Sequence, residues 1–103
     1  MFFKKRPALN TPMDHFLNRD ALSADERAVL DVYLTGVSHA LTGLNTVRAS
    51  NGLNHVFTLP DGQRLDAPDI EALVGEFLKQ RPDMQKQPLG LCAVMAVLQR
   101  FPV

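Results

Sequence analysis

A capping box followed by a long run of apolar residues at helical spacing is the feature that most restricts how this chain can fold. Ser23 and Glu26 stand three residues apart, so the hydroxyl of one and the carboxylate of the other can each accept a hydrogen bond from the other residue's backbone N–H. Beyond this box the apolar residues recur at steps of three and four, which predicts a long helix with one buried stripe. The stripe consists of Val29, Leu30, Tyr33, Val37, Ala40, Leu41 and Leu44.

Two glycines interrupt the predicted long helix, and each costs about 1 kcal/mol relative to alanine in a helix interior. Gly43 is expected to mark the fraying end of the helix. Gly36 lies one turn from Tyr33, and it is expected to permit a close approach by another element because it has no side chain.

A short helix is predicted ahead of the long one. Thr11 suits the N-cap, Pro12 the first helical position and Asp14 the first turn, where the helix dipole favours negative charge. This helix is expected to end near Asn18, and its apolar contacts are Met13, Phe16 and Leu17.

Two further helices are predicted in the second half of the chain. Asp66 caps a helix that must stop before Pro82, because the residue ahead of a proline is pushed out of helical geometry. The last helix runs from about Pro88 to Arg100, and Phe101 is expected to pack back against the core. The inward-facing residues are Ile70, Leu73, Val74, Phe77 and Leu78 in the first of these helices and Leu91, Cys92, Met95 and Leu98 in the second.

The segment between residues 48 and 64 shows no helical period. Asn51-Gly52 and Asp61-Gly62 are turn signatures, since both residue types tolerate positive φ. The alternating residues 55–59 have no second alternating run to pair with, and an isolated hairpin is marginal. The sequence therefore predicts an all-α fold, a small bundle of three main helices plus one short N-terminal helix, with an irregular loop between helices two and three.

The length and composition predict one domain over residues 11–103, preceded by a flexible arm over residues 1–10. Eleven basic and eleven acidic residues cancel to zero net charge, so attraction to nucleic acid or to an anionic membrane is not indicated. No apolar run approaches the roughly 20 residues of a membrane span, and polar residues and prolines break the segment after Lys4-Lys5-Arg6. As written, the chain is expected in the cytoplasm, or in the periplasm if a leader was removed.

No set of residues has the spacing of a catalytic or metal site. His15, His39 and His55 lie far apart in the sequence, and Gln63 and Leu65 stand where a calcium loop beginning at Asp61 would need oxygen ligands. The single cysteine, Cys92, is expected to be a small buried residue. The clustered acidic residues Asp66, Asp69 and Glu71 are those that the dipole selects in a first helical turn. The sequence thus predicts a protein that is not an enzyme and that needs no metal or cofactor.

Four pieces of sequence, in this order and spacing, resemble a known family. They are Tyr33-Leu34-Thr35-Gly36-Val37, Phe57-Thr58-Leu59-Pro60, Phe77-Leu78 with Arg81-Pro82, and Phe101-Pro102. The set is similar to the Tai/Rap family, the immunity proteins of type VI secretion amidase effectors, and the similarity covers about residues 28–103. The family usually carries a secretory signal and disulfide cysteines, near the positions held here by Leu30, Thr58 and Val103.

The resemblance implies an all-helical bacterial protein, commonly a homodimer, that blocks the cleft of a peptidoglycan amidase with a protruding loop and helix surface. The loops are therefore the predicted partner-binding regions, since loops on a rigid scaffold carry recognition. The residues chosen are Asn51, Asn54, His55, Arg81, Asp83 and Gln85. Two alternatives use the same fold, namely a small-molecule-binding regulatory domain with a pocket lined by Phe57, Phe77 and Met95, and a dimerisation module without a ligand.

Overall fold

The computed structural model describes residues 10–103, and the side chains from Pro12 onward. The predicted N-terminal arm therefore lies almost entirely outside the described residues. Within residues 10–103 every regular element is a helix, so the predicted all-α fold is confirmed. In chain order these elements are α1 (Asn10–Leu17), η1 (Arg19–Ala21), α2 (Ala24–Ser50), α3 (Ala67–Gln80), η2 (Pro82–Lys86) and α4 (Leu89–Arg100).

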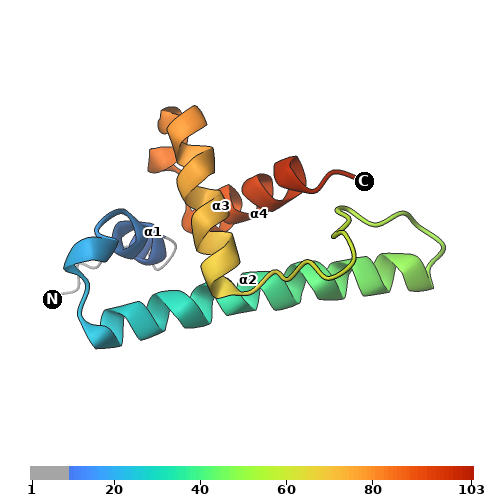
Figure 1. Cartoon of the computed structure of the whole chain (residues 1–103), viewed down its shortest axis with the longest axis horizontal. Coiled ribbons are helices and arrows are strands. Elements are labelled where there is room, and N and C mark those ends of the chain that lie inside the picture. The colour runs from blue at the N-terminus through green and yellow to red at the C-terminus, as the bar shows by residue number, and fades with distance from the viewer. Residues whose placement is uncertain (1–9) are drawn as a thin grey trace, which may run out of the picture.

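Helix α2 forms the base of the molecule, and the other described elements lie on one side of it (Figure 1). Its 27 residues make it about 40 Å long at a rise of 1.5 Å per residue. Helices α3 and α4, with 14 and 12 residues, are about 20 Å long by the same rise. Helices α3 and α4 are therefore each about half as long as α2.

The predicted capping box is present at the start of α2. The Ser23 backbone N–H donates to Glu26 Oε1 at 3.0 Å, and the Glu26 N–H donates to Ser23 Oγ at 3.1 Å. A similar arrangement opens α3, where the Asp66 N–H donates to Asp69 Oδ2 at 2.8 Å. These local signals depend on residues within one helical turn, which explains why the sequence located both helix starts correctly.

The predicted cap of α1 is wrong. The helix already includes Asn10, so Thr11 lies inside its first turn and Asp14 lies beyond that turn. Met13 and Phe16 are buried as predicted, whereas Leu17 is 43% exposed. The prediction rested on the preference of proline for the first helical position, and here Pro12 is the third helical residue.

The predicted end of α2 is also wrong, because the helix continues past Gly43 to Ser50. The predicted stripe is rotated from the true one. Leu30 and Leu41 are buried, but so is Leu34, which the prediction omitted, while Val29 and Leu44 are 51% and 44% exposed. Ala40, a further member of the predicted stripe, is exposed as well.

The close approach predicted at Gly36 occurs at Gly90 instead. No described atom lies within 4 Å of the place where a Cβ on Gly36 would stand. A Cβ on Gly90, at the start of α4, would lie 2.7 Å from the hydroxyl oxygen of Tyr33. The tyrosine of α2 thus packs against the backbone of α4, and this contact fixes how closely the two helices approach.

The core lies where α3 and α4 meet α2 and α1. Helix α3 buries Ile70, Val74, Phe77 and Leu78, as predicted. In α4 the buried side is formed by Leu89, Cys92, Ala93, Ala96 and Val97, so the predicted inward position of Leu91, which is 44% exposed, is wrong. Phe101 packs back onto the core with 5% of its surface exposed, as expected.

Candidate functional site

The loop between α2 and α3 begins with a defined helix end rather than a frayed one. The Leu53 N–H donates to the Arg48 carbonyl at 2.8 Å, and the Gly52 N–H donates to the Ala49 carbonyl at 3.1 Å. Gly52 has a φ of 72°, so this is a Schellman-type end in which glycine holds the left-handed position. The predicted turns at Gly52 and Gly62 are confirmed, since both glycines have positive φ.

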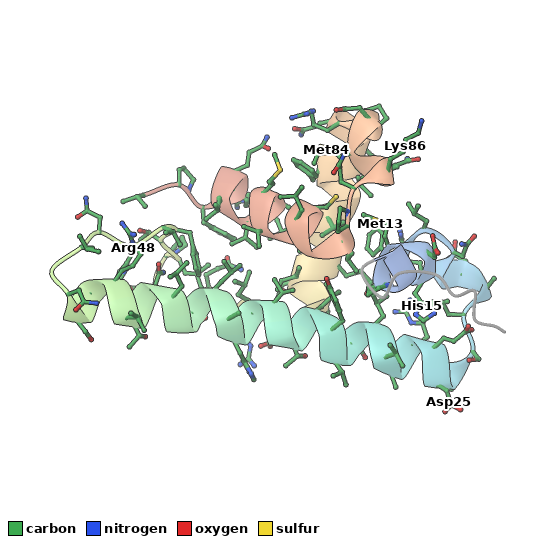
Figure 2. The ribbon with its side chains drawn as sticks, turned by 180° about the vertical axis from the view of Figure 1, so that it is seen from behind. Met13, His15, Asp25, Arg48, Met84 and Lys86 are labelled. Atoms are coloured by element: carbon green, nitrogen blue, oxygen red, sulfur yellow. The ribbon has the colours of Figure 1, made fainter. Side chains whose placement is uncertain are left out.

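Two polar side chains of α2 hold this loop against the helix. Asn45 donates through Nδ2 to the Phe57 carbonyl at 3.0 Å, and its Oδ1 accepts from the Val56 N–H at 2.8 Å. Arg48 donates through Nε to the Asn54 carbonyl, and Figure 2 shows Arg48 directed from the helix toward the loop. The loop between Asn54 and Phe57 is therefore fixed by side chains that belong to a rigid helix.

Three more contacts anchor the same loop. Phe57 is 2% exposed and inserts into the core. The next residue, Thr58, donates its backbone N–H to the Phe101 carbonyl at 3.0 Å. Farther along, the Ser38 hydroxyl donates to the Leu65 carbonyl. The alternating segment 55–59 forms no strand, as predicted. Three of its backbone groups are bonded instead to Asn45 and to the Phe101 carbonyl.

An open groove lies between the C-terminal half of α2 and this loop. No charged residue lines it; its walls are formed by Thr42, Asn45, Thr46, Ala49, Ser50, His55, Phe57, Thr58 and Leu59. The hydroxyls of Thr46 and Ser50 donate to helix carbonyls one turn earlier, at 3.2 Å and 3.0 Å. Each keeps lone pairs that can accept from a ligand. The groove thus suits neutral hydrogen-bonding groups such as amides and hydroxyls.

The predicted residues Asn51, Asn54 and His55 lie at this end of the molecule, and all three are exposed. The side-chain amide of Asn51 already makes one hydrogen bond within the chain, because its Nδ2 donates to the Val47 carbonyl at 3.1 Å. His55 lines the groove. Beside them Leu53 is 52% exposed, so the loop carries one apolar side chain among polar ones.

The other predicted residues, Arg81, Asp83 and Gln85, lie at or in η2, far from the first loop (Figure 1). Arg81 forms a two-pronged ion pair with Asp83, with N–O distances of 3.1 and 3.2 Å. This hydrogen bonding raises the pKa of Arg81 and lowers the pKa of Asp83. Gln85 is exposed. The structure therefore divides the six predicted residues between two separate surfaces, and only the loop after α2 is associated with the groove described above.

The aromatic pocket considered from the sequence is not formed. Phe57 and Phe77 are core residues, 2% and 4% exposed. Each reaches a different surface concavity, and Met95 lines neither of these two. The three side chains therefore do not share a cavity.

Two of the ionisable residues singled out in the sequence, Glu71 and Cys92, have structural roles. Glu71 lies 3.6 Å from Arg19 and 3.5 Å from Arg27, so it joins η1, α2 and α3. Cys92 is fully buried, as predicted, and burial raises the pKa of its thiol. Among the described residues no group of three or more histidine, cysteine, aspartate or glutamate side chains could hold a metal ion.

Sequence reasoning missed the residues that position the loop, above all Ser38, Asn45 and Arg48. A signal was present, because Asn45 and Arg48 continue the buried spacing of Leu34 and Leu41. Polar side chains at such positions face either the core or a chain segment that crosses the helix.

Together the described residues define a small all-helical domain with an open groove at one end. No family model, no curated protein and no solved structure matches the chain. No helix in the described region combines the length and apolarity needed to cross a bilayer.

Proposed function

We propose that this chain is a small non-catalytic protein that binds a protein partner and blocks the partner's cleft. The observation that carries the proposal is the loop after α2, which is exposed at its tip and yet held to the helix by Asn45 and Arg48. A loop that is already ordered loses little conformational entropy on binding. Such a loop is suited to insertion into a rigid cleft.

The surface around the loop tip has the composition of a recognition site. Leu53 supplies an apolar anchor that is 52% exposed, and Asn54 and His55 supply polar groups beside it. An apolar side chain inside a rim of polar groups is the usual arrangement of a protein–protein interface. The groove next to the loop adds hydroxyl acceptors for backbone amides of the partner.

The partner class comes from the resemblance to the Tai/Rap immunity proteins. In this proposal the partner is a peptidoglycan amidase, and the loop Asn51–His55 with the C-terminal half of α2 occludes its active-site cleft. The second surface, formed by Arg81, Asp83 and Gln85, contacts the flank of the partner outside the cleft.

The test is inhibition and binding with purified peptidoglycan amidase effectors. The full chain is expected to inhibit muropeptide cleavage by its cognate amidase and to bind it in titration calorimetry. Leu53→Ala removes three of the four side-chain carbons of the anchor. Because about half of this side chain is exposed and available to the partner, the affinity should fall about five- to tenfold, at about 0.8 kcal/mol per fully buried CH₂ group. Thr35→Ala, on an exposed part of α2 away from the loop, is the matched control.

Two outcomes contradict the proposal. If no amidase is bound or inhibited, the partner class is wrong. If an amidase is inhibited equally well by the Leu53→Ala variant and by the control, the loop is not the binding element.

A further inference from the structure

The groove beside the loop after α2 has two walls of different kinds. The loop runs back along the C-terminal half of α2 (Figure 1), so a helix forms one wall and a non-helical chain segment forms the other. The groove encloses about 670 Å³, which lies within the range of about 300–1,000 Å³ typical of ligand sites. Its volume is therefore large enough for a ligand to be seated between the two walls.

The helix wall carries a row of hydroxyl groups. Thr42, Thr46 and Ser50 follow one another at steps of four residues, and all three are exposed and line the groove. At a rise of 1.5 Å per residue, successive hydroxyls are about 6 Å apart along the helix. The hydroxyls of Thr46 and Ser50 already donate to helix carbonyls, at 3.2 Å and 3.0 Å, so their remaining lone pairs can only accept. The helix wall thus offers acceptors at a regular interval.

An extended peptide presents donors at nearly the same interval. Its rise is about 3.3 Å per residue and alternate residues point the same way, so the N–H groups along one edge repeat about every 6.6 Å. A peptide of about five residues spans about 13 Å, which matches the distance of about 12 Å along the helix from Thr42 to Ser50. A compact ligand such as a single sugar ring has no repeat of this kind.

The loop wall suits the opposite edge of the same peptide. His55 and Thr58 are both exposed and line the groove. An imidazole and a hydroxyl can each donate a hydrogen bond. Because an extended chain carries carbonyl groups on both edges, a peptide lying on the hydroxyl row directs half of its carbonyls toward this wall. The two walls therefore complement the two edges of one peptide backbone.

The lining of the groove also limits the side chains that a peptide can bring. No charged residue of the described chain lines it, so a charged side chain seated there would lose water without gaining a partner of opposite charge. By helical geometry Ala49 lies between the hydroxyl row and Asn45, the residue that holds the loop. Its single methyl group leaves the floor of the groove open to a backbone.

We propose that the groove binds an extended, uncharged peptide segment of about five residues through its main chain. The N–H groups of one edge donate to the hydroxyl row, and the carbonyls of the other edge accept from the loop wall. The inference deepens the proposed function and rests on it for the source of the segment, which is the protein partner. Since the main chain makes the hydrogen bonds, the site tolerates different neutral sequences, as in other complexes that bind extended peptides by their backbone.

The first experiment titrates the isotope-labelled full chain with the pentapeptide acetyl-Ser-Ala-Val-Ala-Ser-amide and follows the amide signals by NMR. The signals of Thr46, Ser50 and His55 are expected to shift together and to saturate, with a Kd on the order of 1 mM. Thr46→Val removes the central acceptor with little change of shape and should weaken binding about fivefold. Thr46→Ser keeps the hydroxyl and should bind as the wild type does. Circular dichroism checks that both variants are folded.

The second experiment tests whether the main chain is recognised. Methylation of the central valine nitrogen of the peptide removes one N–H donor and should weaken binding to the wild-type chain about fivefold or more. In the Thr46→Val variant the same methyl group should have little further effect, because the acceptor has already been removed. Ala49→Leu fills the floor of the groove with a residue that favours a helix nearly as well, and it should abolish binding of both peptides.

Three results would overturn the proposal. They are the absence of a saturable shift of the groove amides up to about 10 mM peptide, equal binding by Thr46→Val and Thr46→Ser, and fully additive effects of Thr46→Val and the methyl group. Failure of the proposed function is seen separately, as peptide binding without any binding or inhibition of an amidase. In that case only the source of the segment is wrong.

Discussion

Asn45 is expected to connect the stability of the domain with its ability to bind. Its side chain makes two hydrogen bonds to the loop, at 3.0 Å to the Phe57 carbonyl and at 2.8 Å from the Val56 N–H. Each such bond contributes a net of about 0.5–1.5 kcal/mol, so Asn45→Ala removes about 2 kcal/mol. Alanine favours the helix over asparagine by about 0.5 kcal/mol, which leaves a net loss of about 1.5 kcal/mol.

This loss corresponds to a fall in melting temperature of about 6–12 °C for a domain of this size. The control is Thr46→Ala at the next position, where the hydroxyl bonds only to the Thr42 carbonyl of its own helix. Because alanine is the better helix former, that variant should be unchanged or slightly more stable. Chemical denaturation of both variants measures the difference.

A local measurement separates loop release from global unfolding. The amide of Val56 donates to Asn45, so its hydrogen exchange should accelerate more in the Asn45→Ala variant than exchange in the core of α3. Partner binding should weaken as well, because the loop would then have to be ordered on binding. The reasoning is refuted if Asn45→Ala and Thr46→Ala have the same stability and the same exchange at Val56.

Three further predictions follow from other contacts. Gly90→Ala places a Cβ 2.7 Å from the Tyr33 hydroxyl, so it should not stabilise the wild-type chain. In a Tyr33→Phe background the same change should raise the free energy of unfolding by about 1 kcal/mol, because alanine favours the helix over glycine. Equal effects in both backgrounds, measured by chemical denaturation, would show that the contact is unimportant. Cys92 is fully buried and burial raises the pKa of its thiol, so Ellman's reagent should label it only after unfolding, and rapid labelling of the native protein would contradict this. Hydrogen bonds from Ser23 lower the pKa of Glu26, so the carboxylate stabilises the fold above its unfolded pKa, and this stabilisation is lost as the pH falls through the folded pKa. NMR titration should give Glu26 an ordinary pKa in denaturant and a lower pKa in the folded chain. Identical values would refute the capping box in solution.

The starts of α2 and α3 and the buried face of α3 were determined by the sequence alone. Each of these features depends on residues within a few helical turns of one another, namely the capping boxes at Ser23 and Asp66 and the apolar stripe of α3. Interactions between residues this close in sequence can be predicted from their spacing. The positive φ of Gly52 and Gly62 was predictable for the same reason, since the requirement belongs to the turn itself.

The buried side of α2 was decided only by the tertiary structure. Apolar residues occupy two adjacent sides of this helix, one with Leu30, Leu34 and Leu41 and the other with Val29 and Val47. Helical period cannot choose between them, because both satisfy the same spacing. The packing of α3 and α4 makes the choice and leaves the second side exposed.

The candidate site was determined by the sequence only as far as its loop. Asn51, Asn54 and His55 were predicted because loops carry recognition; of the three, His55 lines the groove, and Asn51 and Asn54 are exposed nearby. That Asn45 holds the Phe57 carbonyl and the Val56 N–H could not be foreseen, since which backbone groups lack a partner is known only once the loop has folded back along α2. A polar residue at a buried helix position predicts that a hydrogen-bond partner is needed, and only the tertiary structure shows which group is that partner.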